Sequence, residues 1–442
     1  MGRIMQLQES SSRLHSRTIT KLRILSALLV VVGLLFVVFS DGFMIFTTNS
    51  LNKNRDRDII TSSSKVLIIK SAIIKQSSFR LYSVQDDNQN DDENTKTTKT
   101  VINPFVPPFN STESERIAWF QKKLPELHIF KSDKASKKFH SRVLQFFDPS
   151  CEVRVFMTWI SPATSFGNRE LLCVESLFKA HPKGCLIILS RTLDSVTGYR
   201  ILKPLIDRRF KVQPVTPELS FLLNDTPAEA WLNDIKNGNR DPGEIPLAQN
   251  LSNLMRLAVL YKYGGVYLDT DFVVLKPLNG LRNSIGAQSI DVGSKNWSRL
   301  NNAVLIFDMN HPLLLKFLEE FASTFDGNKW GYNGPYLVSR VVRRVQTSPE
   351  QLNFTILSPM AFYPVDWTKI GGLFQKPKNE AQSKWVKAKL RQLSGEAYGV
   401  HLWNKQSNKL LIEEGSIIGK LISDHCIFCI NVYTYRKKLL LS

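Results

Sequence analysis

Short apolar runs alternate with a helical pattern in the middle of the chain. Val153–Trp159 and Leu186–Ser190 are apolar or β-branched runs of strand length, and Lys211–Val215 predicts a third strand. Between the first two runs, Arg169–Ala180 carries apolar residues at helical spacing. This strand–helix–strand alternation predicts an α/β fold with a mainly parallel sheet covered by helices.

The N-terminal part of the chain has a different pattern. Residues 24–46 form an apolar stretch, interrupted only at Asp41, that is long enough for a helix to cross the bilayer core. Basic residues dominate segment 1–23, so the positive-inside rule predicts a cytoplasmic tail there and a lumenal location for everything that follows. A cleaved signal peptide is the alternative, but no small-residue cleavage site follows the apolar run. The pattern predicts a signal anchor and a single-pass type II membrane protein.

Residues 47–110 predict a flexible lumenal stem. Segment 85–100 is polar and charged without an aromatic residue, so it cannot bury enough apolar surface to fold. We therefore expect the lumenal catalytic domain at 111–442. The tail after Cys429 shows no pattern that we interpret.

Composition and charge narrow the classes of partner. A chain of 442 residues can form one large domain or two smaller ones. The formal net charge of +19 favours polyanionic partners such as nucleic acid, an anionic membrane surface or a diphosphate-bearing substrate. The sequence has neither zinc-finger spacing nor the alternation of aromatic and basic residues used by single-strand binders, so we do not expect nucleic acid as a partner.

All five cysteines follow the predicted anchor, where disulfides can form, and the odd number leaves at least one free thiol. Cys426 and Cys429 supply only two of the four ligands of a structural zinc site, so the alternatives are a local disulfide or two buried thiols. Five Asn-x-Ser/Thr acceptor sequences are compatible with a secretory protein, although chance alone yields several in a chain this long. They begin at Asn110, Asn224, Asn250, Asn296 and Asn353.

The stretch 250–278 holds the candidate chemistry. Its first half has apolar residues at helical spacing, with Asn253 and Arg256 three residues apart on another face. Gly264 and Gly265 predict the end of the helix, because glycine readily adopts the left-handed conformation of a helix stop. A short strand, 266–268, then leads directly into Asp269-Thr270-Asp271.

Two carboxylates separated by one residue point to the same side of an extended backbone. At the end of a strand they make a compact oxygen site that suits Mg²⁺ or Mn²⁺ shared with substrate phosphates. A solvated turn is the usual explanation of an isolated Asp-x-Asp. Here, however, Asp269 and Asp271 lie between two apolar runs, which favours a site.

This stretch resembles the Asp-x-Asp sugar-binding region of the α-1,4-glycosyltransferases, the family of the lactosylceramide 4-α-galactosyltransferases and related plant proteins. The resemblance runs from about Val153 to Cys426. It is carried by five segments in order: LAVLYKYGGVYLDTDF at 257–272, NNAVLIF at 301–307, WGYNGPYLVSR at 330–340, AFYPVDW at 361–367 and HLWNKQS at 401–407.

The resemblance implies a GT-A-like fold, with an Asp-x-Asp region at about 153–290 and a C-terminal α-1,4-glycosyltransferase region at about 300–430. It also implies retaining transfer of a galactose-like hexose from a UDP-sugar, dependent on Mn²⁺ or Mg²⁺. The acceptor would be a glycolipid, glycoprotein or polysaccharide in the Golgi lumen. Gly334-Pro335 would shape the acceptor side or, alternatively, form a rigid turn.

By the family pattern, Asp271 would bind the metal, and Asp269 would hold the metal or the ribose of the sugar nucleotide. His401 is either a further metal ligand or a histidine of the core. The predicted donor-binding residues are Asn253, Arg256, Tyr267, Asp269 and Trp403.

One residue departs from the pattern of many such transferases. Asn253 stands where an aspartate usually binds the hydroxyl groups of the donor sugar, and an amide can still hydrogen-bond a hydroxyl but brings no charge. The donor sugar therefore stays open. The alternative functions are a GDP-mannose-using mannosyltransferase of the same fold and a non-catalytic lumenal binding protein, although the latter would not require Arg256, Asp269 and Asp271 together.

Overall fold

The computed structural model describes residues 105–430, 432 and 433. The predicted cytoplasmic tail (1–23), the signal anchor (24–46) and most of the stem lie outside these residues, as does most of the tail after Cys429. Within the described part, no helix has the length and apolar character needed to span a bilayer.

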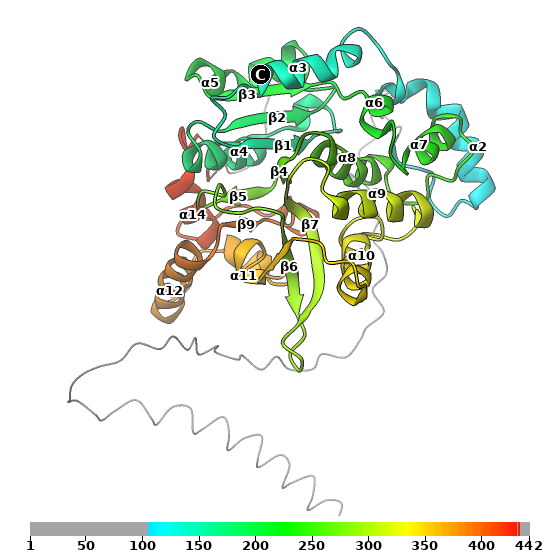
Figure 1. Cartoon of the computed structure of the whole chain (residues 1–442). Helices are drawn as coiled ribbons and strands as arrows, with labels where there is room; N and C mark the ends of the chain where they lie inside the picture. The colour runs from blue at the N-terminus through cyan, green and yellow to red at the C-terminus, as the bar shows by residue number, and fades with distance from the viewer. Residues whose placement is uncertain (1–104, 431, 434–442) are drawn as a thin grey trace, which may run out of the picture. The chain divides into compact units, whose positions relative to one another are not determined.

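A seven-stranded sheet lies at the centre of the described residues (Figure 1). Its strands are β1 (Arg154–Thr158), β2 (Cys185–Leu189), β3 (Lys211–Val215), β4 (Gly265–Leu268), β6 (Ser284–Ile290), β7 (Trp297–Phe307) and β8 (Thr355–Leu357), in the order β3-β2-β1-β4-β7-β6-β8. β3, β2, β1 and β4 pair in parallel, as do β6 and β8, whereas β7 is antiparallel to both β4 and β6. The predicted α/β fold with a mixed, mainly parallel sheet is confirmed, and the three predicted strands match β1, β2 and β3.

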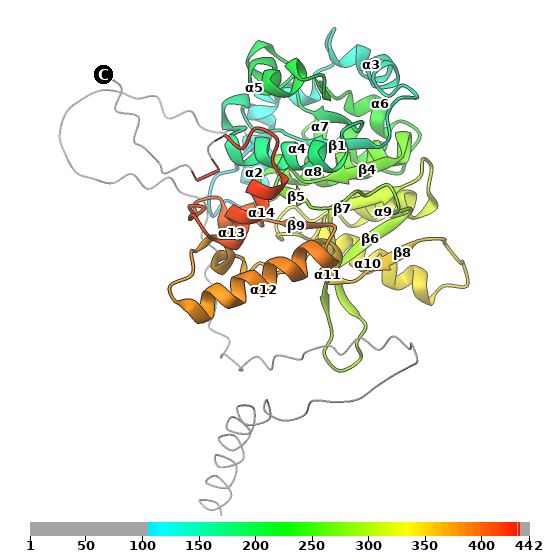
Figure 2. The ribbon, with the colours of Figure 1, turned by 90° about the vertical axis from the view of Figure 1, so that its left-hand side faces the viewer.

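Helices lie on both sides of this sheet (Figures 1 and 2). The longer ones are α2 (Glu113–Lys123), α3 (Phe139–Phe146), α4 (Asn168–Ala180), α5 (Val196–Asp207), α7 (Glu229–Lys236), α8 (Leu247–Tyr263), α9 (Pro312–Thr324), α10 (Pro335–Thr347), α12 (Glu380–Glu396) and α14 (Ile417–His425). The shorter ones are α6 (Leu219–Leu223), α11 (Pro359–Phe362) and α13 (Asn404–Ser407).

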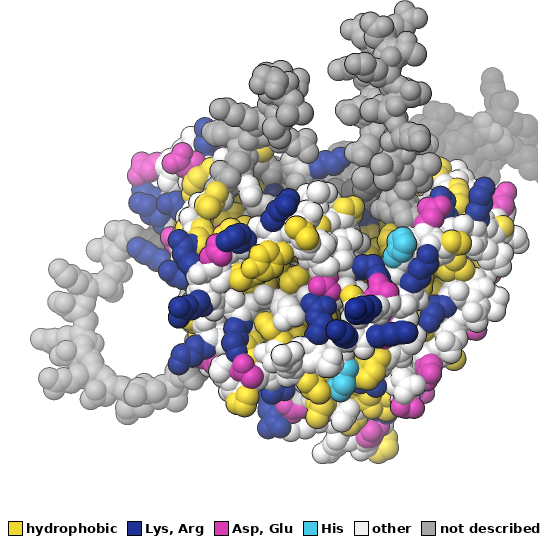
Figure 3. Space-filling model, turned by 90° about the horizontal axis from the view of Figure 1, so that it is seen from above, with side chains coloured by type: hydrophobic (Ala, Val, Ile, Leu, Met, Phe, Trp, Pro, Cys, Tyr) yellow, Lys and Arg dark blue, Asp and Glu magenta, His cyan; other side chains and the backbone are white. Residues whose placement is uncertain are grey.

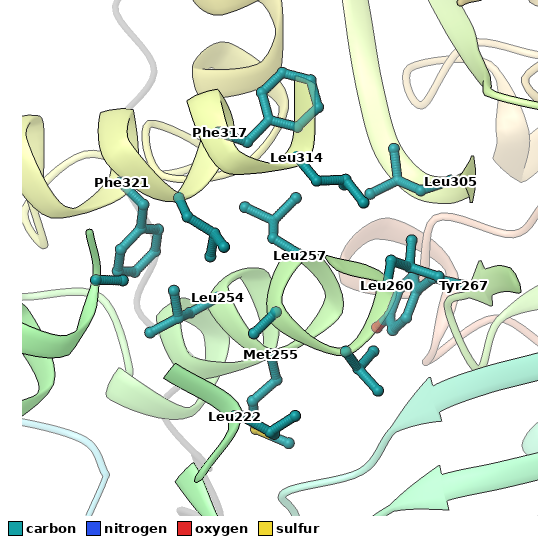
Figure 4. Packing of buried hydrophobic residues seen from close by; sticks show 14 of the residues in the cluster. Leu222, Leu254, Met255, Leu257, Leu260, Tyr267, Leu305, Leu314, Phe317 and Phe321 are labelled. Atoms are coloured by element: carbon teal, nitrogen blue, oxygen red, sulfur yellow. The ribbon is translucent and has the colours of Figure 1, made fainter. Parts of the chain in front are cut away.

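Helix α8 is the central helix of the larger hydrophobic core (Figure 4). Leu254 and Leu257 of α8 face Phe317 and Phe321 of α9, and Leu222 of α6 lies on the other side of the helix. A helix that is apolar around most of its circumference is buried on most sides. The polar residues that α8 carries, such as Arg256 at 2% exposure, are therefore buried too.

A two-stranded sheet joins the middle of the chain to its C-terminal part. β5 (Phe272–Val274) follows β4 almost at once and pairs antiparallel with β9 (Gly399–His401), so that Phe272 lies opposite His401. Near the C-terminus, the buried carboxylate of Glu175 on α4 accepts hydrogen bonds from the backbone N–H groups of residues 427, 428 and 429. These contacts hold the C-terminal segment against α4.

Two disulfides occur among the described cysteines. Cys426–Cys429 is the local disulfide that the sequence left as one alternative, and Cys151–Cys185 was not predicted. Cys173 is a buried free thiol, as the odd number requires. On the face seen from above, which includes α3 and α5, lysine and arginine side chains are mixed with apolar and acidic ones (Figure 3).

Candidate active site

The two aspartates of the Asp-x-Asp motif follow the end of β4. Gly264 has a φ of +63° at the end of α8, which lets the chain reverse from the helix into β4 as predicted. Thr270 and Asp271 then form a turn, so the expected extended backbone between the two carboxylates is wrong. β5 begins directly after the turn and pairs with β9, which brings His401 beside both carboxylates.

Asp269 has one oxygen fully engaged by the protein. Its Oδ1 accepts a hydrogen bond from Tyr267 Oη at 2.9 Å and lies 3.0 Å from Arg256 Nη2. The Asp269 side chain is 26% exposed, although the residues beneath it are buried. Its Oδ2 has only longer contacts, at 3.4 Å to Arg256 Nη1 and 3.9 Å to His401 Nε2, and is therefore the oxygen available to a ligand.

Asp271 shows the same division of its two oxygens. Its Oδ2 accepts the backbone N–H of Asn404 at 2.8 Å. Its Oδ1 lies 3.1 Å from His401 Nε2, and His401 Nε2 lies 3.9 Å from Asp269 Oδ2. One oxygen of each aspartate therefore lies near the same nitrogen, Nε2 of His401.

The imidazole of His401 is held by aromatic packing. The ring of Trp403 lies edge-on to it at a centroid distance of 4.4 Å, and that of Tyr363 at 5.9 Å. Its Nδ1 is buried and has no hydrogen-bond partner among the described residues. The orientation of the ring is thus set by packing and by the carboxylates at Nε2.

Burial and nearby charges shift the pKa values of Asp269, Asp271 and His401 in different directions. Burial raises the pKa of Asp269, and the attraction of Arg256 does not offset it. Burial would also raise the pKa of Asp271, but His401 and the N–H of Asn404 outweigh it, so that pKa is lowered. Burial would lower the pKa of His401, but Asp271 raises it. The two shifts have opposite directions because each of these two groups favours the charged form of the other.

The three residues fit a divalent cation. Asp269, Asp271 and His401 each offer one ligand atom, and these atoms lie within 4.8 Å of one another. Two carboxylate oxygens and one imidazole nitrogen suit Mn²⁺, whereas Mg²⁺ favours oxygen ligands. A cation at this point would also neutralise two carboxylates that lie close together, which removes the repulsion between them.

The other predicted donor-binding residues lie around this cluster. Arg256 is 2% exposed and its guanidinium is fully engaged, with Asp269, the carbonyl of Asn302 and Ser252. Tyr267 is wholly buried beneath Asp269, and its ring lies under the guanidinium of Arg256 at 4.4 Å. The structure places both residues behind Asp269.

Asn253 and Trp403 have different positions. Asn253 is 3% exposed, and its Oδ1 accepts a hydrogen bond from Asn302 Nδ2 at 3.0 Å. Gly334 lies against this amide, since a Cβ there would be 2.9 Å from Asn253 Oδ1. Trp403 is partly exposed and donates from Nε1 to the carbonyl of Val365.

Several residues at the site were missed by sequence reasoning. Thr158 at the end of β1 bonds to both Ser252 and Tyr267. Thr158 could have been predicted from the sequence, because it ends a predicted parallel strand and ligands bind at the carboxyl ends of such strands. Asn404 acts through its backbone, and Arg169 holds the end of α13 through Ser407. Neither has a sequence signal.

The comparisons with known proteins agree with this geometry. Residues 167–290 match the family described as "Glycosyltransferase sugar-binding region containing DXD motif", and residues 306–433 match the "Alpha 1,4-glycosyltransferase conserved region". The first includes both aspartates, and the second includes His401.

Three curated relatives show the extent of the similarity. Lactosylceramide 4-alpha-galactosyltransferase of Mus musculus is 32% identical over 294 residues, which are 64% of this chain and 77% of that protein. An uncharacterized protein of Arabidopsis thaliana is 32% identical over 295 residues, but the chain spans only 44% of its length. Alpha-1,4-N-acetylglucosaminyltransferase of Homo sapiens is 27% identical over 220 residues, 47% of this chain and 58% of that protein.

The chain covers more than two thirds of the mouse enzyme at over 30% identity, both family regions occur in their expected order, and the motif carboxylates converge on one point. The chain therefore belongs to the α-1,4-glycosyltransferase family and is a glycosyltransferase with a DXD sugar-binding region.

Proposed function

We propose that this enzyme transfers a galactose-like hexose from a UDP-sugar to a glycan or glycolipid acceptor, with retention at the anomeric carbon and in dependence on Mn²⁺ or Mg²⁺. The observation that carries the proposal is the convergence of Asp269 Oδ2, Asp271 Oδ1 and His401 Nε2, each directed away from its other partners. Retention and the GT-A-like assignment rest on the family resemblance.

Each residue of the cluster has a proposed role. Asp269, Asp271 and His401 would hold the cation, which when bound supplies positive charge opposite the diphosphate that leaves the sugar. Arg256 and Tyr267 position Asp269 through its Oδ1, and they keep its Oδ2 turned toward the ligand. Mutation of such supporting partners typically lowers metal affinity or activity roughly 10- to 100-fold.

The remaining predicted residues lie around the proposed donor site. Asn253 and its hydrogen-bond partner Asn302 are both buried, so they would support the site from behind without contacting the donor. Trp403 would cover the cation through its contact with His401. Trp330 lies close by, because Lys405 Nζ is 3.3 Å from its ring centroid, and with Gly334-Pro335 it would form the acceptor side.

We further propose a Golgi membrane location with the catalytic domain in the lumen. The apolar stretch 24–46, the basic segment before it and the two disulfides support this proposal. The relatives named for glycolipid synthesis support a glycolipid among the possible acceptors.

The donor is tested with the purified full chain in detergent. UDP with Mn²⁺ is expected to raise the melting temperature more than GDP with Mn²⁺, and stabilisation by GDP alone would support the mannosyltransferase alternative. Hydrolysis of UDP-galactose, UDP-N-acetylglucosamine and GDP-mannose is then measured one at a time. EDTA should stop the reaction and Mn²⁺ restore it, and hydrolysis that resists EDTA contradicts the proposal.

A further inference from the structure

The five Asn-x-Ser/Thr sequences differ in where the fold places their asparagines. Four of these asparagines are exposed: Asn110, Asn224, Asn296 and Asn353. The fifth, Asn250, is 3% exposed on α8. We propose that the four exposed asparagines are N-glycosylated and that Asn250 is unmodified in the folded protein. This inference rests on the lumenal location proposed above but not on the sugar-transfer chemistry.

The modification has a defined co-reactant, an oligosaccharide linked to a polyprenyl diphosphate. The side-chain amide nitrogen of the asparagine forms a bond to the anomeric carbon of the first sugar. The bond from that carbon to the diphosphate oxygen breaks, and the lipid diphosphate leaves with the electron pair and the amide proton is released. The reaction requires the acceptor sequence in a secretory protein, and the folded protein can carry the glycan only where the asparagine lies at the surface.

Asn250 cannot carry a glycan in this fold. Its Oδ1 accepts a hydrogen bond from Asn333 Nδ2 at 3.0 Å, and its own Nδ2 is buried without a partner among the described residues. Ser252, the third residue of the sequence, lies between Thr158 and Arg256 beneath Asp269. A branched sugar on Asn250 would separate α8 from the segment before α10. Because transfer occurs on the unfolded chain, molecules modified at Asn250 would fail to fold.

Asn296 is the last residue of the turn that connects β6 to β7. This hairpin projects from the rest of the described residues (Figures 1 and 2). The carbonyl of Asn296 accepts the N–H of Asp291, which closes the turn between the two strands. Ile290 and Val292 flank Asp291 and are 44% and 73% exposed. A glycan on Asn296 would shield these aliphatic side chains from other molecules, since exposed apolar groups at a strand end favour association.

Asn353 precedes β8, the edge strand of the seven-stranded sheet. An edge strand exposes unpaired backbone groups that can pair with another chain, and bulky polar groups beside it oppose this. Asn110 precedes α2, and Asn224 follows α6. None of the four belongs to the cluster of Asp269, Asp271 and His401, so the modification would leave the proposed ligand atoms themselves unchanged.

The test maps the glycans on the full chain expressed in a eukaryotic secretory system. Peptide mass analysis after enzymatic release in heavy-oxygen water should mark Asn110, Asn224, Asn296 and Asn353 and leave Asn250 unlabelled. Single Asn→Gln variants of the four should each remove one step of gel mobility, and Asn250→Gln none. An unlabelled asparagine among the four refutes the assignment at that position, and a labelled Asn250 in folded protein refutes the burial argument.

Donor hydrolysis by the same preparation separates this inference from the proposed function. If hydrolysis is present and none of the four positions is modified, the inference and the lumenal location fail while the sugar-transfer proposal stands. If all four positions are modified and no donor is hydrolysed, the inference and the lumenal location stand while the sugar-transfer proposal fails. For the shielding role, Asn296→Gln should aggregate at a lower concentration in light scattering than Asn110→Gln, and equal behaviour removes that role.

Discussion

The hydroxyl of Tyr267 gives the sharpest test of how the site is supported, because Tyr267→Phe removes one oxygen from a wholly buried ring. Burial raises the pKa of Tyr267, so the hydroxyl stays protonated and donates to Asp269 Oδ1 at 2.9 Å. A hydrogen bond to a charged group contributes about 1.5–3 kcal/mol. The lower end applies here, because Thr158 and Ser252 still bond to each other after the change.

We expect Tyr267→Phe to lose about 1.5–2 kcal/mol of unfolding free energy. Freed from this donor, Asp269 can turn its oxygens away from the ligand, and Mn²⁺ affinity should fall roughly 10- to 100-fold, as it does for other outer-shell partners of metal ligands. Urea unfolding measures the first quantity and calorimetric titration with Mn²⁺ the second.

Tyr263→Phe is the matched control. Tyr263 is the last residue of α8, and its hydroxyl hydrogen-bonds to His140 at 3.0 Å and to neither aspartate. This variant should leave Mn²⁺ affinity unchanged. If Tyr267→Phe also binds Mn²⁺ as tightly as the native chain, the role of Tyr267 in positioning Asp269 is refuted.

Three further changes test other parts of the account. Asp271→Asn keeps an acceptor for the N–H of Asn404 but loses the charge, so the chain should fold normally while donor hydrolysis falls by at least about 100-fold; normal turnover would falsify the cation assignment. Burial alone would raise the pKa of Glu320, but Arg340 and Arg344 of α10 lower this pKa below its ordinary value. The ionised carboxylate therefore stabilises the fold above the ordinary pKa, and this stabilisation is lost as pH falls through the lowered pKa. Glu320→Gln should therefore lower the free energy of unfolding by about 1 kcal/mol at pH 7, because Arg344 is exposed to solvent and its charge is screened. The difference should shrink as pH falls below the ordinary pKa of a glutamate; a difference that does not change with pH would argue against the ion pairs. Replacing Cys151 and Cys185 by alanine should cost about 4 kcal/mol, because the disulfide closes a separation of 34 residues, and an unchanged urea midpoint would show that it adds no stability.

The features that depend on nearby residues were predictable from the sequence. The helix that ends at Gly264 and the strand that follows it are both confirmed, because glycine punctuation and apolar spacing are local signals. The disulfide Cys426–Cys429 was one of two local alternatives, since its two thiols are three residues apart.

Features that depend on distant pairing were not predictable. His401 was named as a possible metal ligand only through the family resemblance. It reaches the aspartates because β9 pairs with β5 across more than a hundred residues, and neither strand shows that register by itself. The same holds for Cys151–Cys185, which links the segment before β1 to the start of β2. The extended backbone expected at Asp269 was wrong because alternation of side chains along a strand is a local rule. That rule does not foresee the turn at Thr270 and Asp271, which precedes the pairing of β5 with β9.

The central claim is that Asp269, Asp271 and His401 together bind the cation that serves sugar transfer. Anomalous diffraction at the manganese edge, from crystals grown with Mn²⁺ and UDP, tests it most directly. The account predicts one peak within coordination distance of Asp269 Oδ2, Asp271 Oδ1 and His401 Nε2, in contact with the diphosphate. UDP bound with no peak there, or a peak held by other residues, would contradict it.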